Sequence, residues 1–466
     1  MSSRNIFSSP ISVAVLALTL VPLANAADKR PLGPAPITLE QAYDRALATD
    51  QSIRIAYWEI RKANLLPWSA LTKLGPQISA AGSYVKDNAA TRSTIVQNQT
   101  VNVDGVPTTT AQFIDFTNHD RTGSAQASIS YLQPLVDLTV FPAYKLGQIS
   151  KVVARLEHQY TVRGTLFGVA SAYYEVLKQQ RLVDVDREAL RLAGEQLDIA
   201  QKRADVGEVT RSDVLRAQVA VETARRVLVE DENGLELDRN TLRNTLNLNP
   251  NDPIGIVEPP DYPTTLPNFQ DLLGKAYQHR EDLRVKELAI DQDIQRRNEV
   301  IGEYGPKVVA QFDGTRGHIS GDTNTSNYDW QASVSVQLPI FTGGQREVDL
   351  LTANRQIEQT KLDRERTAKT VEADVKSGWL SVRTLEQTLK ALHAQVVAAE
   401  QGYHDLENQY RAGTATSVDV LSALNDLNTA RKDLAVQTYD YQVALRNLEQ
   451  VTGIFQQARV ERIKVR

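Results

Sequence analysis

The chain has 466 residues, a formal net charge of −5 and no cysteine. The missing cysteine side chains exclude disulfide bonds, thiolate metal sites and a lipid-acceptor cysteine, so the protein is not expected to be lipid-anchored. The mild acidity gives no reason to expect a nucleic acid as a partner. No linker divides the chain into compact blocks, and the length therefore favours an elongated molecule.

Residues 1–26 are predicted to be a secretory signal peptide. Arg4 supplies the positive charge, an apolar stretch occupies residues 11–21, and Ala24-Asn25-Ala26 provides a small-x-small cleavage site. A transmembrane anchor is the alternative, but the apolar stretch is shorter than the roughly 20 residues that span a bilayer. We therefore expect an exported protein whose mature chain begins at Ala27.

The rest of the chain repeats one design twice. Gly75-Pro76 recurs as Gly305-Pro306, and Asp213-Val214-Leu215 recurs as Asp419-Val420-Leu421. The spacing between copies is shorter for the second motif, so the first copy carries an insertion between the two motifs. Each copy is expected to contain a helix, a strand, a loop, a strand and two long helices. The predicted divisions are a first repeat over 27–247, a linker over 248–267, a second repeat over 268–453 and a tail over 454–466.

Four segments alternate apolar and polar side chains with a period of two, as half-buried strands do. One face of these segments is apolar and the other is rich in Ser and Gln, which is the pattern of a membrane barrel with a water-filled lumen. A soluble sandwich with one solvated face has the same alternation, so the pattern alone leaves both folds open. The predicted strands are 77–85, 126–132, 307–315 and 330–338, joined by polar surface loops over 86–124 and 316–329.

Four long helices are predicted, over 143–203, 212–247, 344–411 and 417–452. The first and third contain no proline, and at about 1.5 Å per residue each would run roughly 90–100 Å, too long for a globular domain. The other two carry heptads with large residues at one seam position and mostly Ala at the other, which favours close packing and supercoiling. A plain dimeric coiled coil is the alternative, but it leaves the four strands unexplained.

Strands inside a bilayer can have no free edge, because no water is present there to satisfy backbone N–H and C=O groups. Four strands per chain must therefore close with copies of themselves. Two chains would give eight strands, whose interior is nearly filled by side chains, whereas three chains give twelve strands with room for a lumen. A homotrimer is expected if the protein is a conduit.

The order of elements, the double repeat, the turn Leu338-Pro339-Ile340-Phe341-Thr342-Gly343-Gly344 and the paired helical tips resemble the TolC family of outer-membrane efflux and secretion channels. The resemblance covers 38–453. It implies a mainly helical fold with membrane β-structure, in which a trimeric twelve-stranded β-barrel is continued by a long coiled α-helical barrel. It also implies that 248–267 and the C-terminal stretch form a belt around the middle.

The function implied by the resemblance is a passive exit duct, surrounded by outer-membrane lipid and extending into the periplasm. Such a duct works with a periplasmic adaptor, or membrane fusion protein, and an inner-membrane pump of the RND, ABC or MFS type. The rival interpretation is a periplasmic structural coiled-coil protein with a small soluble β domain. The cargo cannot be inferred from this chain.

The resemblance assigns a pore constriction to the end of the helices. Asp419 matches the first aspartate of a ring that narrows the pore, whereas the second ring position is occupied by Ser422. The alternative is that the polar residues here only cap the first turn of the following helices and complement its dipole. The polar partners of the constriction are expected to be Ser212, Asp213 and Tyr410.

The family's bridging arginine falls on Ala415, so the latch is expected to be weaker or to use another arginine. The candidates are Arg203, Arg211 and Arg411.

The tips themselves are expected to meet the adaptor. Gly207 and Gly413 are first of all helix C-cap residues able to take a positive φ. By resemblance, Gly207, Glu208, Gly413 and Thr414 would contact the adaptor. The six histidines show no metal-ligand spacing, and no nucleophile motif is present, so we expect no enzyme, no metal site and no cofactor.

Overall fold

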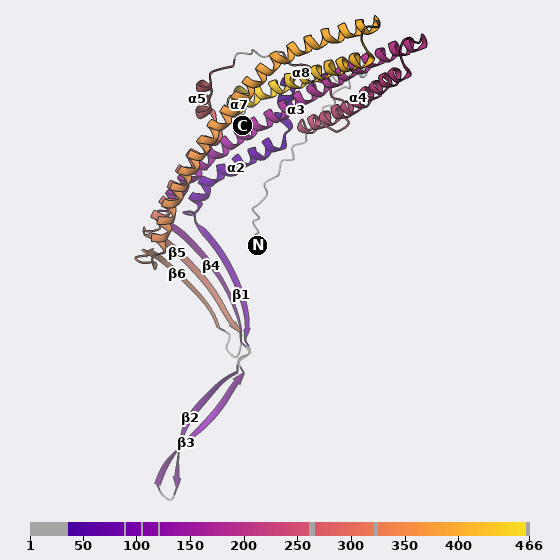
Figure 1. The fold of residues 1–466 in the computed structure, drawn as a ribbon. Helices are drawn as coiled ribbons and strands as arrows, with labels where there is room; N and C mark the ends of the chain where they lie inside the picture. Colours follow the sequence, from indigo (N-terminus) through magenta and orange to yellow (C-terminus); the bar gives the residue numbers. More distant parts are fainter. Residues whose placement is uncertain are drawn as a thin grey trace, which may run out of the picture.

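The computed structural model describes residues 36–462, apart from 88–89, 104–105, 120–121, 261–265 and 321–324. The molecule is elongated: long helices form one end, a four-stranded sheet follows, and a two-stranded hairpin extends beyond the sheet (Figure 1). The predicted signal peptide and the start at Ala27 lie outside the described residues. Within the described ranges, none of the helices combines the length and apolar character needed to cross a membrane.

The four-stranded sheet is antiparallel throughout, in the order β1-β4-β5-β6. Its register aligns large apolar residues: Ile78 pairs with Tyr131, and Tyr131 pairs with Phe312. Because side chains alternate between faces, this register collects apolar residues on one face and most Ser and Gln residues on the other. The strands are β1 (Gln77–Asp87), β4 (Thr122–Val136), β5 (Lys307–Ser320) and β6 (Thr325–Gln337).

The segment 86–124 was predicted to be a loop, and the structure corrects this. β2 (Ala90–Val103) pairs with β3 (Val106–His119) in a separate two-stranded sheet. The many Thr and Asn residues favoured a loop, but Thr is β-branched and suits a strand, and Asp104-Gly105 is a hairpin-turn signal. The loop predicted over 316–329 is corrected in the same way, since β5 and β6 extend into it from both sides. Backbone pairing continues where side-chain polarity indicated a loop.

The helices follow the predicted order with some changed boundaries. Where one helix was expected before the first strand of each repeat, the structure has two. In the first repeat, Asp50 caps the second of these helices by accepting a hydrogen bond from Ile53 N at 3.0 Å. The first long helix begins before Pro142, because a proline is tolerated in the first turn of a helix. The helices are α1 (Leu39–Thr49), α2 (Gln51–Thr72), α3 (Val140–Asp205), α4 (Arg211–Thr245), α5 (Phe269–His279), α6 (Glu281–Gly302), α7 (Gln345–Arg411), α8 (Ser417–Val451) and α9 (Gln457–Arg462).

The largest apolar cluster lies near the middle of the helices and includes the linker and the tail. Phe455 of the tail is 1% exposed, and its ring meets Tyr43 edge-on at 6.1 Å between centroids. Arg163 of α3 donates to Phe455 O at 2.7 Å and forms a buried ion pair with Glu281 of α6 at 2.5 Å. The linker joins this region through a parallel bridge between Ile37 and Ile256. The tail predicted over 454–466 is therefore packed on the helices as far as it is described.

Candidate functional site

The site predicted at the helical tips consists of two turns at the end of the molecule farthest from the sheet (Figure 1). One turn joins α3 to α4, and the other joins α7 to α8. Gly207 and Gly413 have φ values of +81° and +80°, so each takes the left-handed conformation that ends a helix without a Cβ penalty. Both glycines, Glu208 and Thr414 are exposed. The four residues predicted to contact an adaptor thus lie on the outer surface of the tips.

Each turn leads into a helix through the same capping box. Thr416 donates from its backbone N and its Oγ1 to Asp419 Oδ2, at 2.9 and 2.6 Å, and Asp419 N donates back to Thr416 Oγ1 at 3.3 Å. Thr210 and Asp213 repeat this arrangement at the start of α4. The hydrogen bond from the threonine hydroxyl lowers the pKa of each carboxyl, and the threonine N–H lowers it further. Both aspartates therefore complete the capping boxes of their helices and are charged at neutral pH.

Arg203, near the end of α3, connects the two turns. Its Nε lies 3.0 Å from Glu208 Oε2 in the first turn, and its Nη1 donates to Tyr410 O at the end of α7. The guanidinium also lies over the Tyr410 ring, 4.7 Å from its centroid. Tyr410 is buried, and burial raises the pKa of its phenol. Of the three arginines considered in place of Ala415, Arg203 is the one that joins the first repeat to the second.

The remaining predicted residues are less constrained. Ser212 and Ser422 are exposed. Ser422 lines a mostly apolar groove of about 510 Å³ between the first turns of α4 and α8, together with Leu215, Val219 and Val418. This groove was not predicted from the sequence. A signal was present, because Leu215 and Val219 are four residues apart on one face of α4, but their exposure depends on how α4 packs.

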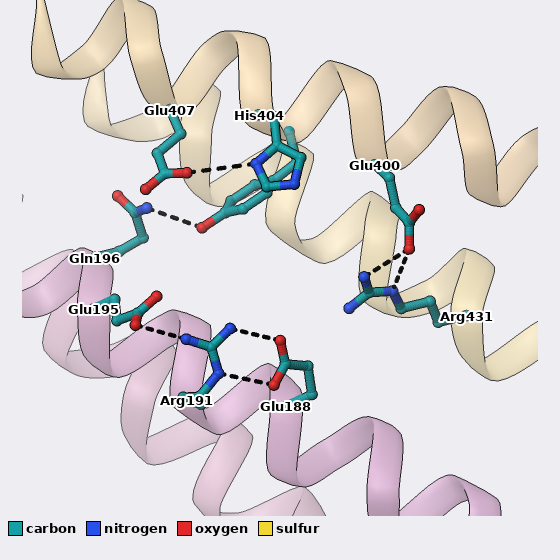
Figure 2. Close-up of polar contacts among 9 residues, drawn as sticks. Glu188, Arg191, Glu195, Gln196, Glu400, His404, Glu407 and Arg431 are labelled. Atoms are coloured by element: carbon teal, nitrogen blue, oxygen red, sulfur yellow. Dashed lines mark hydrogen bonds and ion pairs between the residues drawn. The ribbon is translucent and has the colours of Figure 1, made fainter.

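Further polar links join the helices roughly two to four turns from the tips. Figure 2 shows these contacts. Gln196 of α3 donates to the Tyr403 hydroxyl of α7 at 2.9 Å, and both side chains are buried. Arg431 of α8 pairs with Glu400 of α7 at 2.7 Å. A hydrogen bond thus joins the two repeats here, while the ion pair joins two helices of the second repeat.

A charge cluster with one buried carboxylate lies next to the Arg431 pair and joins three helices. The Nζ of Lys432 in α8 lies 2.6 Å from Asp186 of α3 and 3.1 Å from Asp231 of α4. Asp186 is 3% exposed, and its burial, with Asp231 beside it, raises its pKa to about 6. The residues are far apart in sequence, so no spacing pattern could reveal the cluster. Within the described residues, no group of three or more histidine or acidic side chains is placed to hold a metal ion.

Comparisons with known proteins define the class. A family model described as outer membrane efflux protein matches residues 42–248 and 272–454. The chain belongs to the outer membrane efflux protein family, which confirms the resemblance inferred from the sequence.

Two relatives and two solved structures illustrate this membership. The chain is 26% identical to the outer membrane protein TolC of Vibrio cholerae serotype O1, over 70% of this chain and 76% of the relative. It is 23% identical to the alkaline protease secretion protein AprF of Pseudomonas aeruginosa, over 74% and 73%. The fold matches the outer membrane protein VceC of Vibrio cholerae, with a TM-score of 0.68, 17% identity and coverage of 89% and 96%. It also matches CusC, with a TM-score of 0.70, 15% identity and coverage of 91% and 98%.

The protein is thus an outer-membrane channel, the exit duct of a tripartite efflux pump or a type I secretion system. Its fold is that of trimeric channels in which a twelve-stranded barrel, with four strands per chain, continues into a helical barrel. The barrel lies in the outer membrane and the helices extend into the periplasm. The protein is a conduit and not an enzyme, and the rival interpretation as a structural coiled-coil protein is excluded.

Proposed function

We propose that the helical tips form the periplasmic gate of this channel. The observation that carries this proposal is the Arg203 contact, because it ties Glu208 of the first tip and the end of α3 to Tyr410 of α7. Widening the pore requires the α7–α8 pair to move relative to α3–α4. Arg203 opposes that movement at the point where the displacement would be greatest.

In this proposal, one Asp419 from each protomer forms a ring at the entrance. The capping hydrogen bonds keep each carboxylate charged, so three carboxylates would converge where α8 begins. Such a ring attracts cations and hinders anions. Ser422, one helical turn further on, supplies no second charge, and the ring is therefore single. Asp213 and Ser212 would lie near the entrance as polar partners, while Tyr410, which is buried, acts by holding Arg203.

We further propose that Gly207, Glu208, Gly413 and Thr414 receive a periplasmic adaptor. Their exposure and their position at the far end of the helices support this assignment. The pump behind the adaptor is of the RND, ABC or MFS type. Among the relatives, AprF is named for alkaline protease secretion and TtgC of Pseudomonas putida for toluene efflux, so the family includes both kinds of export.

Single-channel recording tests the ring. Asp419→Ala should lower cation selectivity and weaken block by multivalent cations, because the converging carboxylates are removed. Ser422→Asp should tighten the block by adding a second ring. Asp405→Ala, which removes an exposed carboxylate of α7 before the tip, is the matched control and should change neither property. Unchanged selectivity and block in Asp419→Ala would reduce Asp419 to a capping residue.

A further inference from the structure

The register of the sheet defines rows of side chains on its lipid-facing side. One row contains Ile78, Tyr131 and Phe312, and the row beyond it, farther from the helices, contains Ala80, Ile129 and Trp330. These large apolar residues are exposed in the single chain, as expected for side chains that face lipid. The next two rows are different: one places Gly82 and Ala127 beside Arg316 and Tyr328, and the other places Tyr84 and Ala125 beside His318 and Ser326.

Charges in this distal half of the sheet are divided between its two faces. The alternation of side chains puts Lys86, Arg316 and His318 on the lipid-facing side, and Asp313 and Asp329 on the lumen side. Within the described part of this half, no acidic side chain faces lipid and no basic side chain faces the lumen. Arg316 and Lys86 are exposed, and among the described residues neither has an ion-pair or hydrogen-bond partner. Within the described part of the chain, both cations on this lipid-facing surface are therefore open to an external ligand.

Two of the basic residues, Arg316 and His318, line a hollow. Gly82 and Ala127 have small side chains, and Tyr84, Arg316 and His318 stand around them, giving a depression of about 490 Å³. The Nδ1 of His318 lies 2.8 Å from Ser326 Oγ, which fixes the ring and leaves its other nitrogen available. The hollow therefore combines a small-residue floor with donors at its rim.

The position of the hollow along the strand fixes its depth in the membrane. Outward-facing residues of β5 run from Val308 near the helices to Arg316, which is roughly 26 Å along the strand at about 3.3 Å per residue. For a barrel strand tilted by about 35–45°, this is roughly 20 Å along the membrane normal, near the outer edge of the apolar band. The apolar band of a membrane barrel is about 25 Å tall and is bordered by aromatic residues. Trp330, Tyr328 and Tyr84 provide that border here. Because the helices extend into the periplasm, this border lies at the headgroups of the outer leaflet.

We propose that Lys86, Arg316 and His318 bind the phosphate groups of a phosphorylated glycolipid in the outer leaflet, of the lipid A type. An arginine guanidinium matches the geometry of a phosphate group and forms strong charge-assisted hydrogen bonds with it. Exported cargo passes through the lumen and does not meet these residues. The site was not predicted from the sequence, because Arg316, His318 and Tyr328 fall in a segment that was expected to be a loop.

The test uses native mass spectrometry to measure lipid binding to the purified, delipidated trimer. The wild-type trimer should bind bisphosphorylated lipid A more tightly than the same lipid without phosphates. The double variant Arg316→Gln with Lys86→Gln should lose roughly tenfold or more in affinity, because charge-assisted hydrogen bonds are removed. Lys307→Gln is the matched control, since Lys307 lies on the lumen side at the opposite end of β5, and its binding should be unchanged.

Each outcome bears on the proposal. The mass of the trimer in the same spectra shows whether the variants have assembled. Equal binding of the lipid with and without phosphates would overturn the proposal, as would an equal loss in Lys307→Gln. Complete displacement of the lipid by inorganic phosphate would show a simple anion site instead of a lipid site. A loss confined to the double variant, together with weak competition by inorganic phosphate, supports the proposal.

Discussion

The two helical tips share a local design and differ in their surroundings. Each has a threonine cap followed three residues later by an aspartate that completes the box. In the first tip, Asp213 also lies 3.4 Å from Arg216. In the second tip, Asp419 is exposed and, among the described residues, its side chain contacts only Thr416. The local cap is therefore the same, but only the second aspartate is free of a neighbouring cation and available for a ring.

The same contrast extends up the helices. Arg203 at the tips and Lys432 higher up both tie the second repeat to the first, but in different environments. Both cations are partly buried, with side chains 16% exposed for Arg203 and 29% for Lys432. The carboxylates differ: the side chain of Glu208 is 59% exposed, whereas that of Asp186 is only 4% exposed. A buried charge that loses its partner is costly, whereas a partly exposed one is compensated by water. The lower link is thus suited to opening and the upper link to holding the helices together.

The largest effect is expected from Lys432→Met, which breaks the upper link. Two carboxylates from α3 and α4 would then face one another without a cation, at a cost of about 3–5 kcal/mol. The thermal midpoint of the detergent-solubilised trimer should fall accordingly. The double variant Lys432→Met with Asp186→Asn should recover much of the lost thermal stability, because the buried charge is removed. A midpoint unaffected by Lys432→Met would show that the cluster does not join the repeats.

The pH dependence of trimer stability tests the same charge cluster through Asp186. The pKa of Asp186 is raised to about 6, above the ordinary value for an aspartate. The folded state therefore binds the Asp186 proton more tightly than the unfolded state does. The contribution of this proton to the free energy of unfolding is complete below pH of about 4 and is lost as pH rises through about 6. Asp186→Asn should flatten the stability profile over this window. A profile that keeps its slope in the variant would assign the proton to another group.

An intermediate effect is expected from Arg203→Ala, which breaks the lower link. The variant loses the Glu208 ion pair, the hydrogen bond to Tyr410 O and the contact with the Tyr410 ring. Interactions of this kind are worth about 1.5–3 kcal/mol, so the open state should gain roughly tenfold or more in population. Single-channel recordings in planar bilayers measure this gain. Arg211→Ala is the control, and an equal response in both variants would assign the effect to surface charge.

The smallest effect is expected from the opposite end of the molecule, where the first repeat carries the β2–β3 hairpin and the second carries a short connection. An isolated two-stranded hairpin contributes little stability. Replacing 90–119 by a short turn should therefore leave trimer assembly and conductance unchanged.

Tags inserted in the same region test the membrane topology. Tags inserted within 86–124 and 316–329 should be accessible to protease in intact cells, because both segments lie at the outer end of the barrel. Protection of both tags would invert the predicted topology, and loss of assembly on hairpin removal would give the hairpin a structural role.

The sequence by itself determined the features that depend on near neighbours. Period-two alternation predicted the four barrel strands, and heptads predicted two of the long helices. The polar residues at the tips, Asp213 and Asp419 among them, were also considered as caps of the first helical turn. These signals are readable because a strand face or a helix cap is set by residues within a few positions of each other. The β2–β3 hairpin was not predicted because its polar residues were taken to indicate a loop. Polar residues also form strands when a neighbouring strand supplies backbone hydrogen-bond partners, and a local pattern does not reveal that strand.

The tertiary structure alone decided the contacts between distant segments. The choice of Arg203 over Arg211 and Arg411 depends on how α3 is rotated against α7, which no local pattern encodes. The joining of Asp186, Asp231 and Lys432 depends on the packing of three helices, and the lipid-facing position of Arg316 depends on the register of β5 between β4 and β6. A shift of one residue in that register would turn Arg316 toward the lumen, because neighbouring side chains on a strand point to opposite faces.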